Sequence, residues 1–84
     1  MEIVVGRVKH FYPHIPAAIV ELSEDLKNGD QIVIRKKNGE ERLRQMVTSM
    51  EVEHKKIDQA PAGTEVAVLV EGKVKEGDIV YKLT

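Results

Sequence analysis

Cysteine is absent from this sequence of 84 residues, so no disulfide bond can support the fold. A chain of this length lies near the lower limit of what a hydrophobic core alone can stabilise. The absence of cysteine also excludes a thiolate metal site and a cysteine nucleophile. We therefore expect a single domain over residues 1–84 that depends entirely on its core.

Long apolar runs are lacking as well. No stretch approaches the roughly 20 apolar residues that a membrane-spanning helix needs. The N-terminal segment carries an acid at Glu2 and only a brief apolar run at residues 3–5, which is unlike a signal peptide. These features predict a cytoplasmic protein with no membrane partner.

The sequence also lacks an excess of charge of either sign. Thirteen basic and fourteen acidic residues leave a formal net charge of −1 at pH 7. No overall field therefore attracts nucleic acid, and any contact with RNA has to come from a local patch. Charged residues still make up 32 % of the chain, a share that resembles the composition of thermophilic proteins.

The sequence does contain short β-prone segments separated by turn residues. The expected strands cover residues 3–11, 17–22, 31–35, 41–52, 65–70 and 79–81. No window shows sustained helical periodicity, although Ser23 is a suitable N-cap for one short helical turn. The pattern predicts an all-β domain, a small closed barrel of six to seven strands, because closure removes exposed strand edges.

Several irregularities are expected within these strands. Gly6 predicts a bulge or bend, and Asn38-Gly39 predicts a tight hairpin turn with positive φ at both residues. The apolar residues of segment 41–52 change parity near Met46-Val47, which predicts a bulge there. Segment 65–70 is apolar on both faces, which predicts a strand covered on both sides.

Segments 26–32 and 74–80 repeat one pattern, in which an apolar residue and a lysine precede Gly-Asp and a strand. Glycine can adopt positive φ, and the aspartate side chain can accept a hydrogen bond from nearby backbone N–H groups. We therefore interpret Asp30 and Asp78 as parts of strand-entry turns and not as catalytic residues.

Two local groups of basic residues are candidates for contact with RNA. One is His54-Lys55-Lys56, and the other is Arg35-Lys36-Lys37 with Arg42 and Arg44 across the Asn-Gly hairpin. Lysine and arginine in such groups bind phosphates, which is how many proteins hold single-stranded nucleic acid. A solvated turn is the alternative for each group. If the two groups share a face, an RNA-binding stripe is favoured.

Phe11 and Tyr12 are two of only three aromatic residues, and they precede a proline-rich loop. One suits packing on the end of the barrel while the other contacts a base or a protein partner; packing alone is the alternative. His10 and His14 do not share a helical face, and no acid completes a site around them. We therefore expect no metal and no cofactor.

Catalytic patterns are weak. Ser49 lacks a Gly-x-Ser-x-Gly setting. Glu51 and Glu53 are close enough in sequence to form a carboxylate pair, but nothing around them supplies the burial that would adapt a carboxyl group to acid–base chemistry. The sequence predicts that the chain is not an enzyme.

Three segments, in the right order and at similar spacing, resemble domain 2 of elongation factor Tu and its relatives among the translational GTPases. They are residues 26–34, with Leu-Lys-x-Gly-Asp-x-Ile-x-Ile, residues 49–66 and the closing segment 75–80. The resemblance implies a Greek-key β-barrel. It also implies that Glu51 lies under the terminal adenosine of a transfer RNA and that His54 stands where the family has Arg or His. The phosphate loop G-x-x-x-x-G-K-[ST] is absent, so no nucleotide is expected.

We therefore predict a non-catalytic binding module related to translation elongation factors, which engages RNA (a transfer-RNA end or ribosomal RNA) or the translation machinery. The predicted RNA-binding residues are Glu51, His54, Lys55, Lys56, Arg35 and Arg44. The alternative is an accessory barrel that docks on a separately encoded enzyme through Phe11 and Tyr12. Such a barrel would be similar to those appended to collagenase-like peptidases.

Overall fold

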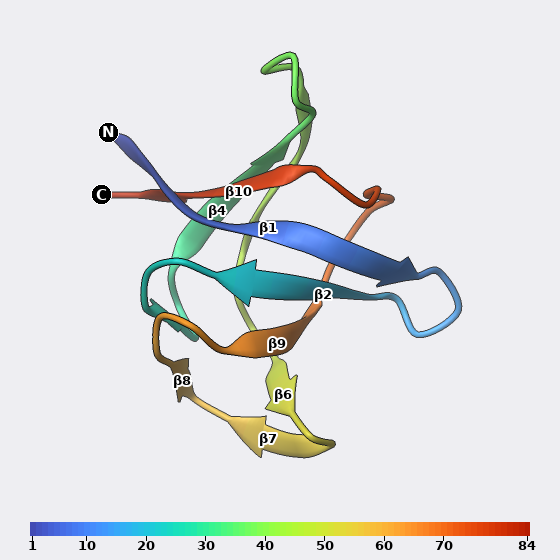
Figure 1. Cartoon of the computed structure of the whole chain (residues 1–84), viewed down its shortest axis with the longest axis vertical. Helices are drawn as coiled ribbons and strands as arrows, with labels where there is room; N and C mark the ends of the chain where they lie inside the picture. Colours follow the sequence, from blue (N-terminus) through green and yellow to red (C-terminus); the bar gives the residue numbers. More distant parts are fainter.

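A computed structural model describes all 84 residues, and the chain consists of ten β-strands with their connecting turns (Figure 1). The strands are β1 (Glu2–Tyr12), β2 (Ala17–Leu22), β3 (Leu26–Lys27), β4 (Gln31–Arg35), β5 (Glu41–Met46), β6 (Met50–Val52), β7 (Lys55–Ile57), β8 (Gln59–Ala60), β9 (Glu65–Leu69) and β10 (Ile79–Leu83). No helix is present, and so none could cross a membrane.

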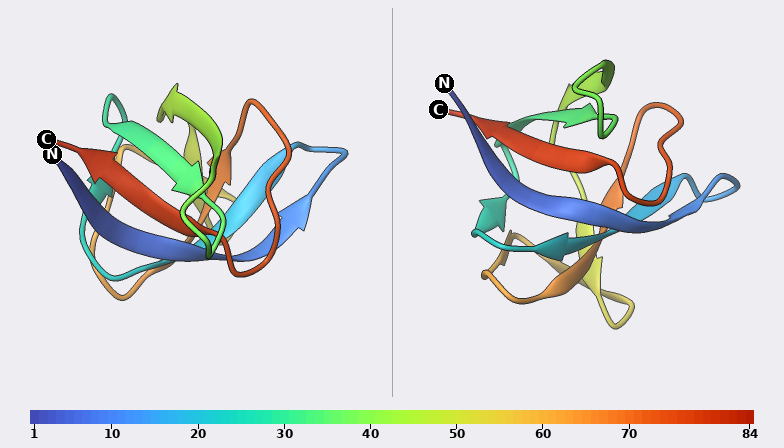
Figure 2. Two further views of the ribbon diagram at one scale, coloured as in Figure 1. Left: turned by 90° about the horizontal axis from the view of Figure 1, so that it is seen from above. Right: turned by 45° about the horizontal axis from the view of Figure 1, so that its top comes forward.

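Eight of the strands form one antiparallel sheet in the order β5-β4-β10-β1-β2-β9-β6-β7, and β3 pairs with β8 in a small second sheet. The large sheet curves around the core, and the two chain ends lie side by side (Figure 2). They are joined by a hydrogen bond of 3.0 Å from the N-terminal amine to the carbonyl of Thr84. The predicted all-β domain is confirmed.

A closed Greek-key barrel is not confirmed, because the edge strands β5 and β7 do not pair with each other. Residues 47–49, which connect β5 to β6, leave the sheet and bond to other parts of the chain instead. Val47 exchanges backbone hydrogen bonds with Gly29 and Asp30, and the carbonyl of Ser49 accepts one from Leu69. The sheet therefore surrounds the core without complete strand-to-strand closure.

The core is a cluster of 16 buried apolar residues contributed by the inner face of the sheet and by the connecting segments. In β2, Ala18, Val20 and Leu22 are buried, while Ala17 and Ile19 alternate with them and point outward. The outward residues of this strand are thus apolar too. Part of the outer surface of the sheet is apolar for this reason.

The expected strand over residues 41–52 is wrong as a single element, because β5 ends at Met46 and β6 begins at Met50. Gln45, Val47 and Met50 are all buried. Strict alternation cannot place residues 45, 47 and 50 on one side of a strand, so the strand breaks at the predicted change of parity. The Gln45 amide spans the break by donating to the carbonyl of Leu69 (3.0 Å) and accepting from the N–H of Glu71 (2.7 Å).

The two Gly-Asp segments form the same strand-entry turn, as predicted. The carboxylate of Asp30 accepts from the N–H of Lys27 at 3.0 Å, and that of Asp78 accepts from the N–H of Lys75 at 2.8 Å. The glycines between them have φ values of 96° and 92°. Residues 26–27 belong to β3, so the short helical turn considered after Ser23 does not form.

Hairpin geometry differs from expectation in one respect. The Asn38-Gly39 hairpin is present, but only Gly39 has a positive φ, and the N–H of Lys36 bonds the carbonyl of Glu40 across a three-residue loop. The tight two-residue turn with positive φ at both central residues instead joins β6 to β7. Its residues are Glu53 (φ 51°) and His54 (φ 66°).

Candidate binding groove

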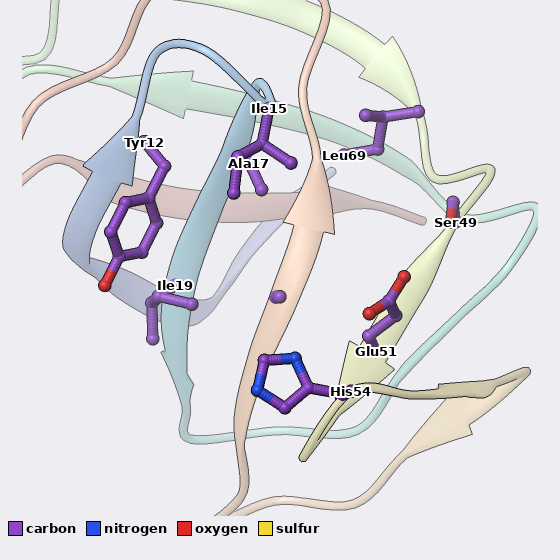
Figure 3. A pocket seen from close by; sticks show the side chains of 9 residues that line it. Tyr12, Ile15, Ala17, Ile19, Ser49, Glu51, His54 and Leu69 are labelled. Carbon is purple, nitrogen blue, oxygen red and sulfur yellow. The ribbon is translucent and has the colours of Figure 1, made fainter.

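A groove of about 320 Å³ lies on the outer face of the sheet, across β2, β9 and β6 (Figure 3). The loop between β1 and β2 borders one side of it, and the β6–β7 hairpin borders the other. Nine residues line it: Tyr12, Ile15, Ala17, Ile19, Ser49, Glu51, His54, Ala67 and Leu69. We call this feature the outer groove.

Strand register explains why the surface is hollow here. Ala67 of β9 lies opposite Ile19 of β2 on one side and opposite Glu51 of β6 on the other. The small alanine therefore stands between two longer side chains in the same row, which leaves a depression above its methyl group. In the next row, Ala17 lies opposite Leu69 and extends the apolar floor.

The polar side chains around the outer groove are free of protein partners. Tyr12, Ser49, Glu51 and His54 make no side-chain hydrogen bond or ion pair, although the Tyr12 ring meets the His10 ring edge-on with centroids 4.4 Å apart. Other charged side chains of the sheet are held in ion pairs, as in Arg7–Glu21, Lys9–Glu65, Arg35–Glu2, Lys36–Glu40, Arg42–Asp78, Arg44–Glu41 and Lys82–Asp30. The four polar side chains of the groove are therefore available to a ligand.

The β6–β7 turn that carries His54 is strained. Its two central residues take the left-handed conformation that glycine and asparagine adopt with least cost. Residues other than glycine held in this region cost on the order of 1 kcal/mol each, and such strain concentrates at functional sites. The turn holds the His54 ring over the outer groove, beside Glu51 (Figure 3).

The structure separates the predicted RNA-binding residues into two groups. Glu51 and His54 line the outer groove, and Lys55 and Lys56 lie beside them on the exposed strand β7. Lys56 stands opposite Glu51 in the strand register, yet the two form no ion pair. The β4–β5 hairpin lies at the opposite end of the molecule (Figure 1). The two basic groups do not share a face, so they form no RNA-binding stripe.

Arg35 and Arg44 are held by carboxylates at that far end. The Arg35 guanidinium donates to both carboxylate oxygens of Glu2, at 3.1 and 2.8 Å, and Arg44 donates to Glu41 at 3.0 Å. These hydrogen bonds hold the pKa of Glu2 and that of Glu41 below their usual value of 4.5. Both arginines are therefore engaged in ion pairs within the sheet.

Phe11 and Tyr12 divide between packing and exposure. Phe11 packs against the core cluster, whereas Tyr12 is 44 % exposed and lines the outer groove.

The expectation that β9 is covered on both sides is wrong, because Leu69 is 40 % exposed on its outer face. Sequence reasoning missed the apolar floor for that reason. The sequence feature that could have revealed the apolar floor is the presence of apolar residues on both faces of β9, together with Ile19 of β2.

Ser49, Glu51 and His54 lie in one groove, but no hydrogen bond joins any two of them. A nucleophile–base pair requires contact within hydrogen-bond distance, and Glu51 lies between the other two (Figure 3). No group of three His, Cys, Asp or Glu side chains is placed to hold a metal ion. No two of Ser49, Glu51 and His54 are therefore placed as a nucleophile with its base.

Comparison with known proteins relates the chain to peptidases. No family model matches it. The chain is 41 % identical over 83 residues to an uncharacterized protease of Methanocaldococcus jannaschii, a match that covers 98 % of this chain and 20 % of the protease. The chain thus spans about one fifth of the length of that curated relative.

Solved structures point in the same direction. The C-terminal domain of a putative U32 peptidase of Geobacillus thermoleovorans superposes with a TM-score of 0.86 and 18 % identity, covering 96 % of this chain and 92 % of that domain. Its selenomethionine variant superposes with a TM-score of 0.84, also at 18 % identity, over 93 % of this chain and 96 % of that one. At this identity the likeness establishes a common fold.

These matches correct the resemblance to elongation factor Tu. Two of the three segments that carried it, residues 26–34 and 75–80, begin with strand-entry turns, whose Gly-Asp pattern serves backbone geometry. The match over nearly the whole chain is to a protease, and the matched structures are peptidase C-terminal domains. The identification as a translation-factor domain was wrong, and the expectations of translation and RNA binding that rested on it are withdrawn. The chain is related in sequence to a segment of a protease and shares the fold of the C-terminal domain of a putative U32 peptidase.

Proposed function

We propose that this chain is a non-catalytic accessory domain that docks on the catalytic part of a U32-type peptidase. The observation that carries the proposal is the 41 % identity over nearly the whole chain to about one fifth of a protease. The remaining four fifths of that protein is where we place catalysis. The proposal keeps one part of the alternative drawn from the sequence, an accessory barrel on an enzyme, but assigns docking to a surface other than Phe11 and Tyr12. It holds whether the enzyme is a separate polypeptide or a continuation of this one.

The absence of bonded catalytic groups in the outer groove supports a non-catalytic role. Its serine, glutamate and histidine are not joined by hydrogen bonds, so none of them activates another. Purified chain should therefore release no product from a denatured casein substrate. Hydrolysis that persists after repeated purification and is lost in Ser49→Ala or Glu51→Gln would contradict this part of the proposal.

A basic face around Gly77 supports docking. Two adjoining shallow hollows there are lined by six basic side chains and two acidic ones, although the whole chain has a net charge of −1. The basic residues are Arg7, Lys9, Lys36, Lys37, Arg42 and Lys75. We call this surface the Gly77 face. A surface of this charge would be complementary to an acidic surface, and we propose that the catalytic part presents one.

Within the Gly77 face, Lys37 and Lys75 have no acidic partner. Lys37 lies directly over Gly77, where a Cβ atom on the glycine would come within 2.9 Å of its Cε. The other four cations of this face are each in an ion pair: Arg7 and Lys9 with Glu21, Lys36 with Glu40, and Arg42 with the buried carboxylate of Asp78. Lys37 and Lys75 are therefore the cations most available to a partner.

Docking can be measured between ¹⁵N-labelled chain and the M. jannaschii protease lacking its matched fifth. We expect amide shift changes or line broadening centred on the Gly77 face, weakened about tenfold by the double charge reversal Lys37→Glu/Lys75→Glu. The matched control Lys55→Glu/Lys56→Glu reverses two charges at the opposite end and should leave docking unchanged. Docking would be refuted if no amide responded at millimolar concentration, the effective concentration that a short linker provides.

A further inference from the structure

We infer that the outer groove binds a linear polypeptide segment in which a bulky apolar side chain is followed by a lysine or arginine. This inference rests on the proposed function for its choice of a polypeptide as the source of that chemistry, since a peptidase acts on polypeptides. It concerns a surface distinct from the Gly77 face. The groove is lined by residues of β2, β6 and β9, none of which lines the Gly77 face.

The floor of the outer groove selects an apolar side chain. Ile19 and Leu69 flank the shallow position above Ala67, and six of its nine lining residues are hydrophobic. Ile15 adds an exposed apolar side chain from the loop between β1 and β2, with 63 % of its surface accessible. An aliphatic side chain lying over Ala67 would remove these surfaces from water, at about 25 cal/mol for each Å² of apolar area buried.

Charge complementarity selects the neighbouring cation. Glu51 is partly buried at the edge of the groove and makes no ion pair or side-chain hydrogen bond. Lys56 is the one basic residue directly opposite it in the strand register, and it too has no ion-pair partner. A lysine or arginine that follows the apolar residue can reach this carboxylate, and a charged hydrogen bond is stronger than a neutral one.

The size of the groove favours a linear segment over a folded surface. A volume of about 320 Å³ accommodates one or two side chains. A stable interface between folded proteins buries roughly 800 Å² on each partner, far more than this hollow offers. The strained turn at Glu53 and His54 supplies an independent sign of function, because it keeps an imidazole at the groove at a cost in stability.

The test is a titration of ¹⁵N-labelled chain with three capped peptides. They are Ac-Gly-Leu-Lys-Gly-NH₂, its neutral counterpart with Gln in place of Lys, and Ac-Gly-Ser-Lys-Gly-NH₂. We expect the Leu-Lys peptide to shift the amides of Ile19, Ala67 and Leu69, with Kd in roughly the millimolar range. The neutral peptide should bind about threefold to tenfold more weakly, and the serine peptide should bind more weakly than the Leu-Lys peptide.

Two variants test which groove residues determine the preference among the peptides. Glu51→Gln should abolish the preference for lysine over glutamine while keeping the remaining spectrum, and Ile19→Ser should weaken the two leucine peptides more than the serine peptide. Glu24→Gln, an exposed carboxylate away from the groove, is the matched control and should change nothing. Equal affinity for the lysine and glutamine peptides, or a lysine preference that survives Glu51→Gln, would overturn the inference.

Two other occupants give different results. If a second copy of this chain fills the groove, the same amides shift on concentrating the protein without peptide. If a small amine is the true ligand, isoamylamine binds as tightly as the Leu-Lys peptide. Either result overturns the inference and leaves docking through the Gly77 face intact. Conversely, if the chain does not dock on the truncated protease but still binds the Leu-Lys peptide, only the proposed function is refuted.

Discussion

Asp78 and Asp30 occupy equivalent turns but differ in their burial and in their ion pairs. Each accepts a backbone N–H from the residue three positions earlier. Asp78 is only 4 % exposed and also accepts from the guanidinium of Arg42, which is itself mostly buried. Asp30 meets only Lys82, at 3.8 Å. The carboxylate in the second turn is thus the more buried of the two and has the closer ion-pair partner.

We predict that Asp78→Asn lowers the free energy of unfolding by about 2–4 kcal/mol, because it leaves a buried guanidinium without its counter-charge. Asp30→Asn should cost about 1 kcal/mol or less, since its ion pair is long and its turn bond can be kept by the amide. Urea unfolding of the two variants measures the difference. Equal losses would show that the Arg42 ion pair adds nothing to the turn.

The strained β6–β7 turn provides a second prediction at this scale. Glycine adopts the φ of 66° found at His54 with little strain, so His54→Gly should raise the free energy of unfolding by about 0.5–1 kcal/mol. Lys55→Gly, the next position and without positive φ, should lower it instead. Thermal unfolding of both variants distinguishes strain from a general effect of glycine. A destabilised His54→Gly would mean that the imidazole stabilises the fold by packing.

Among the elements, β1 and β2 leave no room for a side chain at Gly6. A Cβ atom there would lie 2.5 Å from the carbonyl oxygen of Glu21 and 2.9 Å from Cγ1 of Val20. The register of β1 against β10 shifts between Val4 and Gly6, so the bulge predicted from the sequence is confirmed. The glycine allows the long strand β1 to bend while it pairs with both neighbours.

We expect Gly6→Ala to lower the free energy of unfolding by about 2–3 kcal/mol, because the two strands must separate to admit the methyl group. Gly72→Ala is the matched control. Its Cβ would meet only the end of the Leu43 side chain at 3.4 Å, and the change should be close to neutral. Denaturant midpoints of the two variants test the claim, which fails if both behave alike.

The Glu2–Arg35 pair joins the start of β1 to the end of β4 and should give stability a pH dependence. The guanidinium lowers the pKa of Glu2 below 4.5, so its contribution is present above that pH and is lost as pH falls through the lowered pKa. Glu2→Gln should therefore be less stable than the natural chain at pH 7, and the gap should shrink below about pH 4.5. Urea midpoints of both proteins across pH 2–7 measure this difference in stability. A difference that does not change with pH would mean that ionisation of Glu2 does not affect stability.

Sequence reasoning succeeded at this scale where local chemistry decides the outcome. The bounds of β2 and β4, the two Gly-Asp turns and the position of the Asn38-Gly39 hairpin follow from β-branched residues and turn chemistry. It failed where contacts distant in sequence decide. The break after Met46 depends on the bonds of Gln45 to residues 69 and 71, and no local pattern reveals those partners.

The site was half predictable for the same reason. Glu51, His54 and Tyr12 stood out by residue type, and the fold brings them to one groove. The apolar floor did not stand out, because Ile19 and Leu69 are indistinguishable in sequence from core residues. Which face of β9 meets the core is a property of the whole sheet. The sequence likewise does not show that the two basic groups lie at opposite ends of the molecule, because their separation along the chain does not fix their separation in space.

For the molecule as a whole, the two proposed binding surfaces are compatible with one role. The Gly77 face is basic and shallow, which suits docking on an acidic surface. The outer groove is apolar with one free carboxylate, which suits a linear segment. An accessory domain that docks by one surface and holds a polypeptide by the other would increase the local concentration of substrate near a catalytic part.

Docking itself is most directly measured in a chimaera. In the M. jannaschii protease, the matched fifth is replaced by this chain, by this chain with Lys37→Glu/Lys75→Glu, or by nothing. Because a docked domain stabilises the partner that it binds, the urea midpoint of the catalytic part should rise with the natural chain relative to the truncated protein. The charge-reversed chain should restore less of the rise. A catalytic part that unfolds at the same midpoint in all three proteins would contradict the account.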